Sequence, residues 1–264
     1  MMKESYLRYY KSQSRIATWR FKLDSLFARS PTQKDGLSNR SVDYRTIKDN
    51  EQLRNLHFNL NKVLQEQSTN WDSHDYGEGY FYQSLDEICV SGLRDTSARI
   101  AALNMSQHVS GRTVLDIGSN TGFMSIGLAK SAKSVEGIES NPYLNKIGYM
   151  TAEYLGLQNL KFNDTSFEDF RSKHRYDVVT SFANHSTYDG NTQHTIQEYV
   201  AKCHSLINKD GLLLFESHAP AYEGSKLDDV LNLFKQRFNI LESLILKTGK
   251  RFDDGRTLFI ADPK

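Results

Sequence analysis

The chain has 264 residues, and its 33 basic and 32 acidic side chains leave a formal net charge of +1, which excludes a chain that is basic throughout, as a general polyanion binder would be. Its two cysteines, Cys89 and Cys203, lie far apart in no paired motif, which argues against a disulfide framework or a zinc site and favours a reducing compartment. No run of about 18 apolar residues and no signal-peptide core occurs, so we expect no membrane span and a cytoplasmic location.

Residues 1–91 are predicted to form a helical N-terminal extension, because the first 75 residues are polar and poor in glycine. The first 30 residues carry seven basic and two acidic side chains. Apolar side chains recur there at helical spacing: Tyr9, Ile16, Trp19, Leu23 and Phe27. A basic amphipathic helix could bind a membrane surface or a nucleic acid. We favour the simpler interpretation that its apolar stripe packs on the rest of the chain.

Strand and helix patterns alternate over residues 92–264. The predicted strands are 112–118, 134–140, 159–164, 176–182 and 211–217, followed by a hairpin of 239–249 and 255–263. The predicted helices are 122–132, 142–156, 192–207 and 226–238. This alternation predicts one α/β domain with a doubly wound, mostly parallel sheet that binds its ligand at the carboxyl ends of the strands. The terminal hairpin is the antiparallel exception.

The loop after the first strand of this domain, GSNTG at residues 118–122, differs from a dinucleotide-binding loop. Asn120 replaces the glycine that lets a pyrophosphate approach the backbone, although asparagine can still adopt the positive φ of such a turn. Asp116 stands just before the loop, where a carboxylate repels a pyrophosphate and attracts an ammonium group. The loop therefore favours a ligand with an ammonium group for Asp116 and a small carboxylate for the helix N-terminus, as in the methionine part of S-adenosylmethionine.

Two more acids end the next two predicted strands. Glu139 lies 21 residues after Gly118, where a carboxylate can accept hydrogen bonds from both hydroxyls of a ribose. Asp164 ends the third strand, near where an adenine amino group would lie, and Thr165 follows it. Acids at three successive strand ends are more specific than any one of them.

The motifs VLDIGSNTGF, VEGIESNPY, FNDTSFEDF, YDVVTSFAN and LINKDGLLLFES resemble the successive motifs of class I S-adenosylmethionine-dependent methyltransferases. The resemblance covers roughly residues 92–262. It implies a seven-stranded sheet of order 3-2-1-4-5-7-6 whose last strand, in the terminal hairpin, is antiparallel. It also implies that Asp116, Gly118, Asn120 and Gly122 hold the methionine moiety, Glu139 the ribose, and Asp164 with Thr165 the adenine.

The catalytic candidates lie after the fourth and fifth strands of the sheet. His185 is the first choice for a general base, since an unperturbed histidine pKa of about 6.5 suits that task. His218 and Glu216 are the other candidates. An alternative is that these three residues and Asp189 converge on a divalent metal, as in metal-dependent O-methyltransferases, although we predict no metal.

The acceptor pocket is predicted to use Asn184, Tyr188 and Asp189, with Tyr80 and Tyr82 as a wall from the segment before the first strand. In the same segment, Arg94 is expected to pair with the methionine carboxylate or with an acidic substrate.

The fourth-strand sequence FANH (182–185) lacks the paired prolines typical of amino methyltransferases of DNA bases. Cys203 is expected to be a buried helix residue rather than the thiolate of a C5-cytosine enzyme. The leading hypothesis is thus methyl transfer to an oxygen, less readily a nitrogen, of a small molecule or glycan, with the N-terminal helices as a lid or homodimer contact. The alternative is a tRNA-modifying methyl- or carboxymethyltransferase that grips RNA with residues 1–30.

Overall fold

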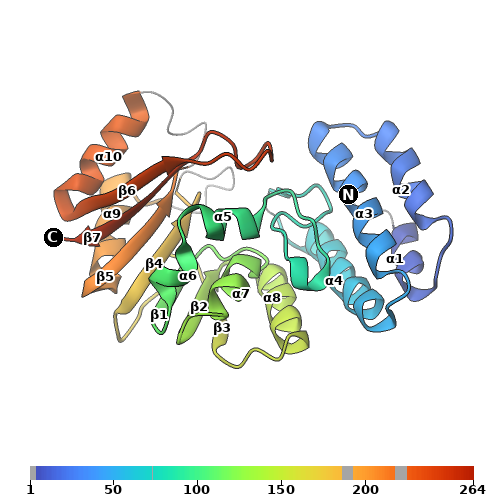
Figure 1. Ribbon diagram of the computed structural model, residues 1–264, viewed down its shortest axis with the longest axis horizontal. Helices are drawn as coiled ribbons and strands as arrows, with labels where there is room; N and C mark the ends of the chain where they lie inside the picture. The colour runs from blue at the N-terminus through green and yellow to red at the C-terminus, as the bar shows by residue number, and fades with distance from the viewer. Residues whose placement is uncertain (1–3, 73, 186–192, 218–224) are drawn as a thin grey trace.

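The computed structural model describes residues 4–72, 74–185, 193–217 and 225–264. Figure 1 shows helices from the N-terminal part of the chain beside a twisted sheet that has helices on both faces. The elements before the sheet are α1 (Glu4–Lys11), α2 (Ala17–Leu26), α3 (Pro31–Ile47), α4 (Glu51–Asn70), the short 3₁₀ turn η1 (Asp86–Ile88), α5 (Thr96–Ala102) and α6 (Met105–Val109).

The sheet contains β1 (Thr113–Ile117), β2 (Ser134–Glu139), β3 (Leu160–Asp164), β4 (Tyr176–Phe182), β5 (Ile207–Glu216), β6 (Phe238–Ile245) and β7 (Thr257–Pro263). Its order is β3-β2-β1-β4-β5-β7-β6, and β7 runs antiparallel to both of its neighbours. The predicted fold class, strand order and antiparallel last strand are therefore confirmed. The intervening helices are α7 (Phe123–Ala129), α8 (Pro142–Tyr154), α9 (Ile196–Leu206) and α10 (Ser225–Arg237).

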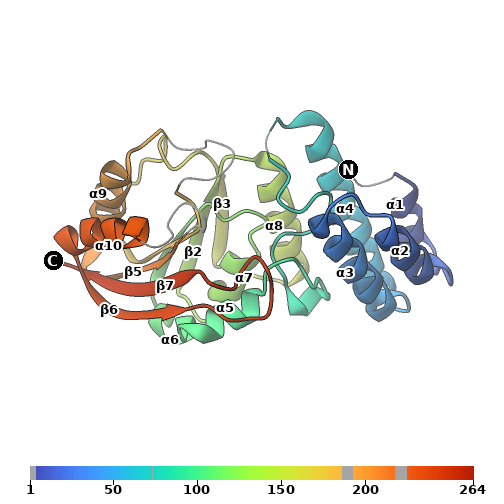
Figure 2. The ribbon, with the colours of Figure 1, turned by 90° about the horizontal axis from the view of Figure 1, so that it is seen from above.

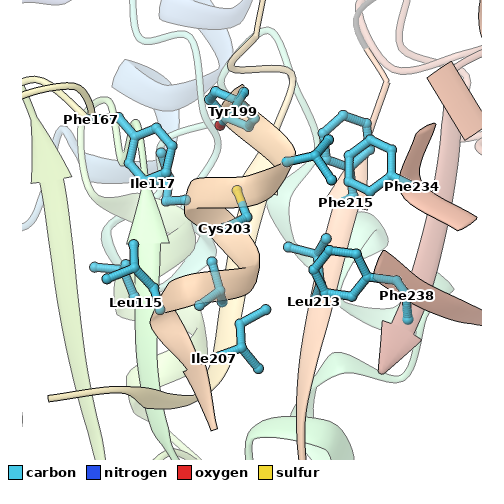
Figure 3. Close-up of a cluster of buried hydrophobic side chains, with 14 of the residues drawn as sticks. Leu115, Ile117, Phe167, Tyr199, Cys203, Ile207, Leu213, Phe215, Phe234 and Phe238 are labelled. Carbon is cyan, nitrogen blue, oxygen red and sulfur yellow. The ribbon is translucent and has the colours of Figure 1, made fainter. Parts of the chain in front are cut away.

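The two faces of the sheet are covered by different helices because neighbouring strand residues point to opposite sides. On one face, Leu115 and Leu213 pack against α9 and α10, with Cys203 at the centre (Figure 3). On the other face, Val114 and Leu214 pack against α5, α6 and α7. Figure 2 shows the sheet between these two layers. Cys203 is completely buried and burial raises its pKa, which confirms it as a small core residue.

The N-terminal helices form a separate aromatic cluster that contains Tyr6, Tyr9, Tyr10, Phe21 and Tyr44. The expectation of one buried stripe from Tyr9 to Phe27 is wrong in two ways. The chain leaves the helix between α1 and α2, and the side of α2 that is buried carries Ala17 and Phe21. Trp19 and Phe27, which belong to the predicted stripe, are exposed.

The N-terminal helices are fixed to the rest of the chain by buried polar contacts. Asp43 of α3 accepts hydrogen bonds from the hydroxyl of Tyr80 and from the backbone N–H of Ser91, the latter at 3.1 Å. The Nε2 atom of His57 in α4 lies 2.6 Å from the carbonyl oxygen of Ile88. These contacts anchor the connecting segment that passes over the carboxyl ends of the strands. No helix in the described ranges is both long and apolar enough to cross a membrane.

Candidate functional site

A pocket lies where β1, β2 and β4 end, and residues from the C-terminal end of α4 and the following segment cover it. Its floor contains Asp116, Gly118, Asn120 and Glu139. The predicted cofactor residues at the ends of the first two strands therefore meet in one cavity.

The glycine loop has the left-handed backbone that its sequence requires. The φ angles of Gly118, Asn120 and Gly122 are 64°, 54° and 75°, so asparagine does adopt the positive φ expected at position 120. Gly118 lines the pocket, and a Cβ atom there would collide with the side chain of Asn184. Gly122 does not line the pocket; a Cβ atom there would run into the ring of Phe162, so its structural role is to let α7 pack on the sheet.

Asp116 is a buried carboxylate at the base of the pocket. It accepts a hydrogen bond from the hydroxyl of Thr180 at 2.7 Å and another from the hydroxyl of Ser125. Burial raises the pKa of Asp116, while these hydroxyls and nearby Arg99 oppose the rise. The two hydroxyls therefore hold this carboxylate in a fixed orientation at the base of the pocket.

Glu139 connects the loops after β1 and β2. Its Oε2 atom accepts a hydrogen bond from the backbone N–H of Asn120 at 3.1 Å, and its Oε1 atom accepts one from Asn141 at 3.0 Å. Burial raises the pKa of Glu139, while these backbone N–H groups lower it. The side-chain nitrogen of Asn141 is buried on the pocket wall and has no hydrogen-bond partner among the described residues. A buried donor of this kind is normally satisfied, so it indicates a ligand that brings an acceptor.

Gln83, which the sequence analysis did not single out, occupies the N-terminus of α7. Its Oε1 atom accepts hydrogen bonds from the backbone N–H groups of Phe123 at 2.9 Å and Met124 at 3.3 Å, and its Nε2 atom donates to the carbonyl of Ser119 at 3.3 Å. This corrects the expectation that the start of this helix takes the ligand's carboxylate, because the first two N–H groups of the helix are already paired with Gln83. No local pattern marks Gln83, since its partners lie about forty positions further along the chain.

Glu216 and Arg94 belong to a buried ion-pair network. The carboxylate of Glu216 accepts hydrogen bonds from Arg94 at 2.6 Å, Arg99 at 2.8 Å and Arg256 at 3.2 Å. Arg94 also donates to Asp253 at 2.7 Å. Burial raises the pKa of Glu216, but the three arginines outweigh burial and lower it to about 2.

The expected catalytic role of Glu216 is therefore corrected. A carboxylate with a pKa of about 2 stays ionised at neutral pH and is too weak a base to take a proton, and Glu216 does not line the pocket. Arg94 and Arg99 do line it, so the network presents cationic side chains to the ligand although two carboxylates balance most of their charge.

The aromatic wall consists of Trp71, His74, Tyr76 and Tyr82. Tyr82 lies where the sequence placed it. Tyr80 was assigned to the same wall, but its side chain is buried away from the pocket because its hydroxyl binds Asp43. Trp71 and His74 were not predicted, since no local pattern indicates that the chain folds back over the site after α4.

The loop after β4 brings Asn184 to the site. Asn184 donates a side-chain hydrogen bond to the carbonyl of Ile117 and lies between the main pocket and a smaller hollow that Thr165 lines. Asp164 is exposed beside that hollow, without lining it, and accepts a hydrogen bond from Asn145 at 2.7 Å.

His185 is mostly buried next to Asn184 and lines neither the main pocket nor the smaller hollow. One of its ring nitrogens, Nε2, lies 3.2 Å from the carbonyl oxygen of His194, and its ring packs edge-on against Tyr199. Burial lowers the pKa of His185. The other predicted residues of these loops, Tyr188, Asp189 and His218, lie outside the described residues. Two of the four residues in the metal alternative are among them, and the described part of the chain contains no cluster of three potential metal ligands.

A sheet of this order, with its last strand antiparallel and a pocket at the carboxyl ends of β1, β2 and β4, has the architecture of class I methyltransferases. A methyltransferase domain family model matches residues 108–251, more than half of the chain. The chain therefore belongs to the S-adenosylmethionine-dependent methyltransferases of class I, as the sequence motifs indicated.

Two curated relatives and one solved structure illustrate this similarity. The chain is 29% identical over 110 residues to a methyltransferase-like protein of a Geobacillus species, a match covering 41% of this chain and 43% of that protein. It is 32% identical over 91 residues to the 23S rRNA (uracil(1939)-C(5))-methyltransferase RlmD of Hahella chejuensis, covering 34% of this chain and 20% of the relative. The chain thus spans less than half the length of either relative.

The solved structure is the N-methyltransferase NodS of Bradyrhizobium japonicum in complex with S-adenosyl-L-homocysteine. It is 13% identical, covers 78% of this chain and 98% of its own, and superposes with a TM-score of 0.53. This similarity concerns the fold.

Proposed function

We propose that the chain binds S-adenosylmethionine in the pocket at the ends of β1 and β2 and transfers its methyl group to a small acceptor. The observation that carries this proposal is the meeting of two fixed carboxylates, Asp116 and Glu139, with the unpaired side-chain donor of Asn141. Asp116 would bind the methionine ammonium and Glu139 the ribose hydroxyls. Asp164 and Thr165, beside the adjoining hollow, would face the adenine.

The carboxylate of the methionine moiety would lie against Arg94. The N-terminus of α7 is occupied by Gln83, whereas Arg94 and Arg99 both reach the pocket wall. When bound, the cofactor supplies a sulfonium methyl group that is open to nucleophilic attack. The remaining contributions of the protein are to orient the acceptor and to remove its proton where needed.

We propose an oxygen, less readily a nitrogen, of a small molecule or sugar as the acceptor. The aromatic wall of Trp71, His74, Tyr76 and Tyr82 closes over the pocket, which favours a compact substrate that stacks on rings. Asn184 would contact this substrate, with Tyr188 and Asp189 further along the same loop.

His185 is the proposed general base. The contact with the His194 carbonyl favours the neutral tautomer that carries its proton on Nε2, because a carbonyl oxygen can only accept. Burial lowers the pKa of His185, which favours the neutral ring that a general base requires. His218 stays a second candidate for this role.

The cofactor assignment is tested by Glu139→Ala. We expect S-adenosylmethionine to bind more weakly by roughly 1–3 kcal/mol, because ribose hydroxyls would be buried without an acceptor. Isothermal titration calorimetry measures this, with Glu153→Ala on the exposed side of α8 as the control. Wild-type affinity in Glu139→Ala would refute the assignment.

The acceptor assignment is tested by a screen that reads S-adenosylhomocysteine release with sugars, nucleotides, phenols and bulk tRNA. On the acceptor found, His185→Ala should lower kcat by about 10²-fold and leave S-adenosylmethionine affinity unchanged, because general bases contribute about that much. The exposed His174→Ala variant should retain full activity. Full turnover by His185→Ala would remove His185 from the mechanism.

A tRNA-modifying activity is the second candidate, and the exposed cations of α2 and its flanks favour it. Deleting residues 1–30 is a poor test, since Tyr6, Tyr9 and Phe21 are part of the core of the N-terminal helices. The double variant Arg15→Glu/Lys22→Glu leaves that core intact. If wild-type protein shows no salt-sensitive tRNA binding, or if the variant binds tRNA equally well, this alternative fails.

A further inference from the structure

Helix α2 has two apolar faces, and only one of them is covered by protein. Its inner face packs into the aromatic cluster through Ala17 and Phe21. Its outer face carries a row of exposed side chains that we call the α2 outer face: Ile16 (62% exposed), Trp19 (65%), Leu26 (73%) and Phe27 (78%). Trp19 and Leu26 are seven positions apart and share one side of the helix, and Ile16 and Phe27 are the residues that cap its two ends. Figures 1 and 2 show α2 at the end of the molecule remote from the sheet.

Exposed cations surround the α2 outer face. Within residues 15–29 the basic side chains are Arg15, Arg20, Lys22 and Arg29, and all four are exposed. The single acid in that range, Asp24, is held by the Tyr6 hydroxyl and by Arg20 at 3.3 Å. The surface therefore combines large apolar side chains with a rim whose four cations exceed its single acid.

We propose that the α2 outer face docks the protein reversibly on an anionic phospholipid membrane. A short helix with Trp, Phe, Leu and Ile on one side and cations beside them lies in the interface of a bilayer, where the apolar side chains enter the acyl region and the cations meet lipid headgroups. Single exposed apolar residues are ordinary, whereas four gathered on one short helix and its two caps mark an interaction site.

The composition of the row favours lipid over RNA. Trp19 and Phe27 could stack on bases, but the branched Ile16 and Leu26 offer no such stacking and gain only from an apolar environment. The absence of a spanning helix among the described residues poses no difficulty, because an interfacial helix lies on the bilayer and does not cross it.

The experiment is co-sedimentation of the full chain with phosphatidylcholine vesicles, with and without phosphatidylglycerol, at low and high salt. We expect binding to the anionic vesicles that weakens with salt, and a shift of tryptophan emission that the Trp19→Phe variant reduces. Trp19→Ser/Phe27→Ser and, separately, Arg15→Gln/Lys22→Gln should each reduce partitioning by about tenfold or more. The matched control is Leu241→Ser/Ile245→Ser, which removes two exposed apolar side chains from β6 and should bind as wild type.

Three results would overturn the proposal. The first is absence of vesicle binding by the wild-type chain, or equal binding to neutral and anionic vesicles. The second is a dimer in size-exclusion chromatography that Trp19→Ser/Phe27→Ser dissociates, because the occupant would then be a second copy. The third is a chain that does not bind vesicles but binds tRNA, with tRNA binding lost when the α2 outer face is changed. Unfolding curves of each variant verify that the aromatic cluster of α1 and α2 remains folded.

Discussion

Gln83 joins the segment that covers the pocket to the loop that forms its floor. Its side-chain oxygen accepts hydrogen bonds from the first two backbone N–H groups of α7, which have no partner within that helix. We expect Gln83→Ala to lower the free energy of unfolding by about 1–3 kcal/mol, because these buried groups would lose their acceptor.

The same variant should weaken S-adenosylmethionine binding, since the glycine loop would lose its support. Urea unfolding and calorimetric titration measure the two effects, with the exposed Gln52→Ala on α4 as control. If Gln83→Ala has the stability and affinity of the wild type, Gln83 does not position the loop.

Glu216 shows what a single residue in the sequence can and cannot reveal. An acid at the end of a strand in this fold was expected to act in catalysis, as Asp116 and Glu139 were expected to bind cofactor. Its partners Arg94 and Arg99 lie 122 and 117 positions earlier in the chain, and no local pattern could have linked them. Local spacing predicted where each acid stands, but only the packing of distant segments decides which of them faces the ligand.

At the scale of elements, α4 and the η1 turn are held together by a buried histidine. Burial lowers the pKa of His57 to about 4, although its contact with the Ile88 carbonyl opposes this. The unfolded chain therefore binds the proton more strongly than the folded chain does. The contribution of His57 to stability is complete above about pH 6.5 and is lost as the pH falls toward 4.

We accordingly expect His57 to account for a loss of about 2 kcal/mol in unfolding free energy between pH 7 and pH 5. Urea unfolding at both pH values measures this loss, and His57→Gln should show a smaller one because glutamine does not titrate. An equal loss in both proteins would assign the pH dependence to other groups.

The strands and helices that were predicted in residues 92–264 lie within a few residues of their predicted bounds, because alternation and helical spacing are local signals, whereas the short helices α5 and α6 were not predicted. The same signals failed at α2. Both of its sides carry apolar residues, so spacing alone cannot tell which side Phe21 will bury and which side Trp19 will leave exposed.

At the scale of the whole molecule, the sequence predicted the sheet order and the region of the pocket through motifs that lie between residues 114 and 217. It did not predict the cover of the pocket. Trp71 and His74 come from a segment whose position depends on the packing of α4 against α8, through residues such as Leu60 and Ile147. Contacts of this kind join parts of the chain that are far apart in sequence, so no periodic pattern in the sequence predicts them.

The Arg94–Glu216 ion-pair network extends beyond the part of the chain that matches the methyltransferase family. Of its five members, Arg94, Arg99, Glu216, Asp253 and Arg256, only Glu216 lies within residues 108–251, the part that matches the methyltransferase family. A fragment with those bounds would keep the buried carboxylate of Glu216 and lose all three arginines that neutralise its charge. Exchange of this domain between relatives, by recombination or by design, would therefore have to carry both flanking segments together with the core.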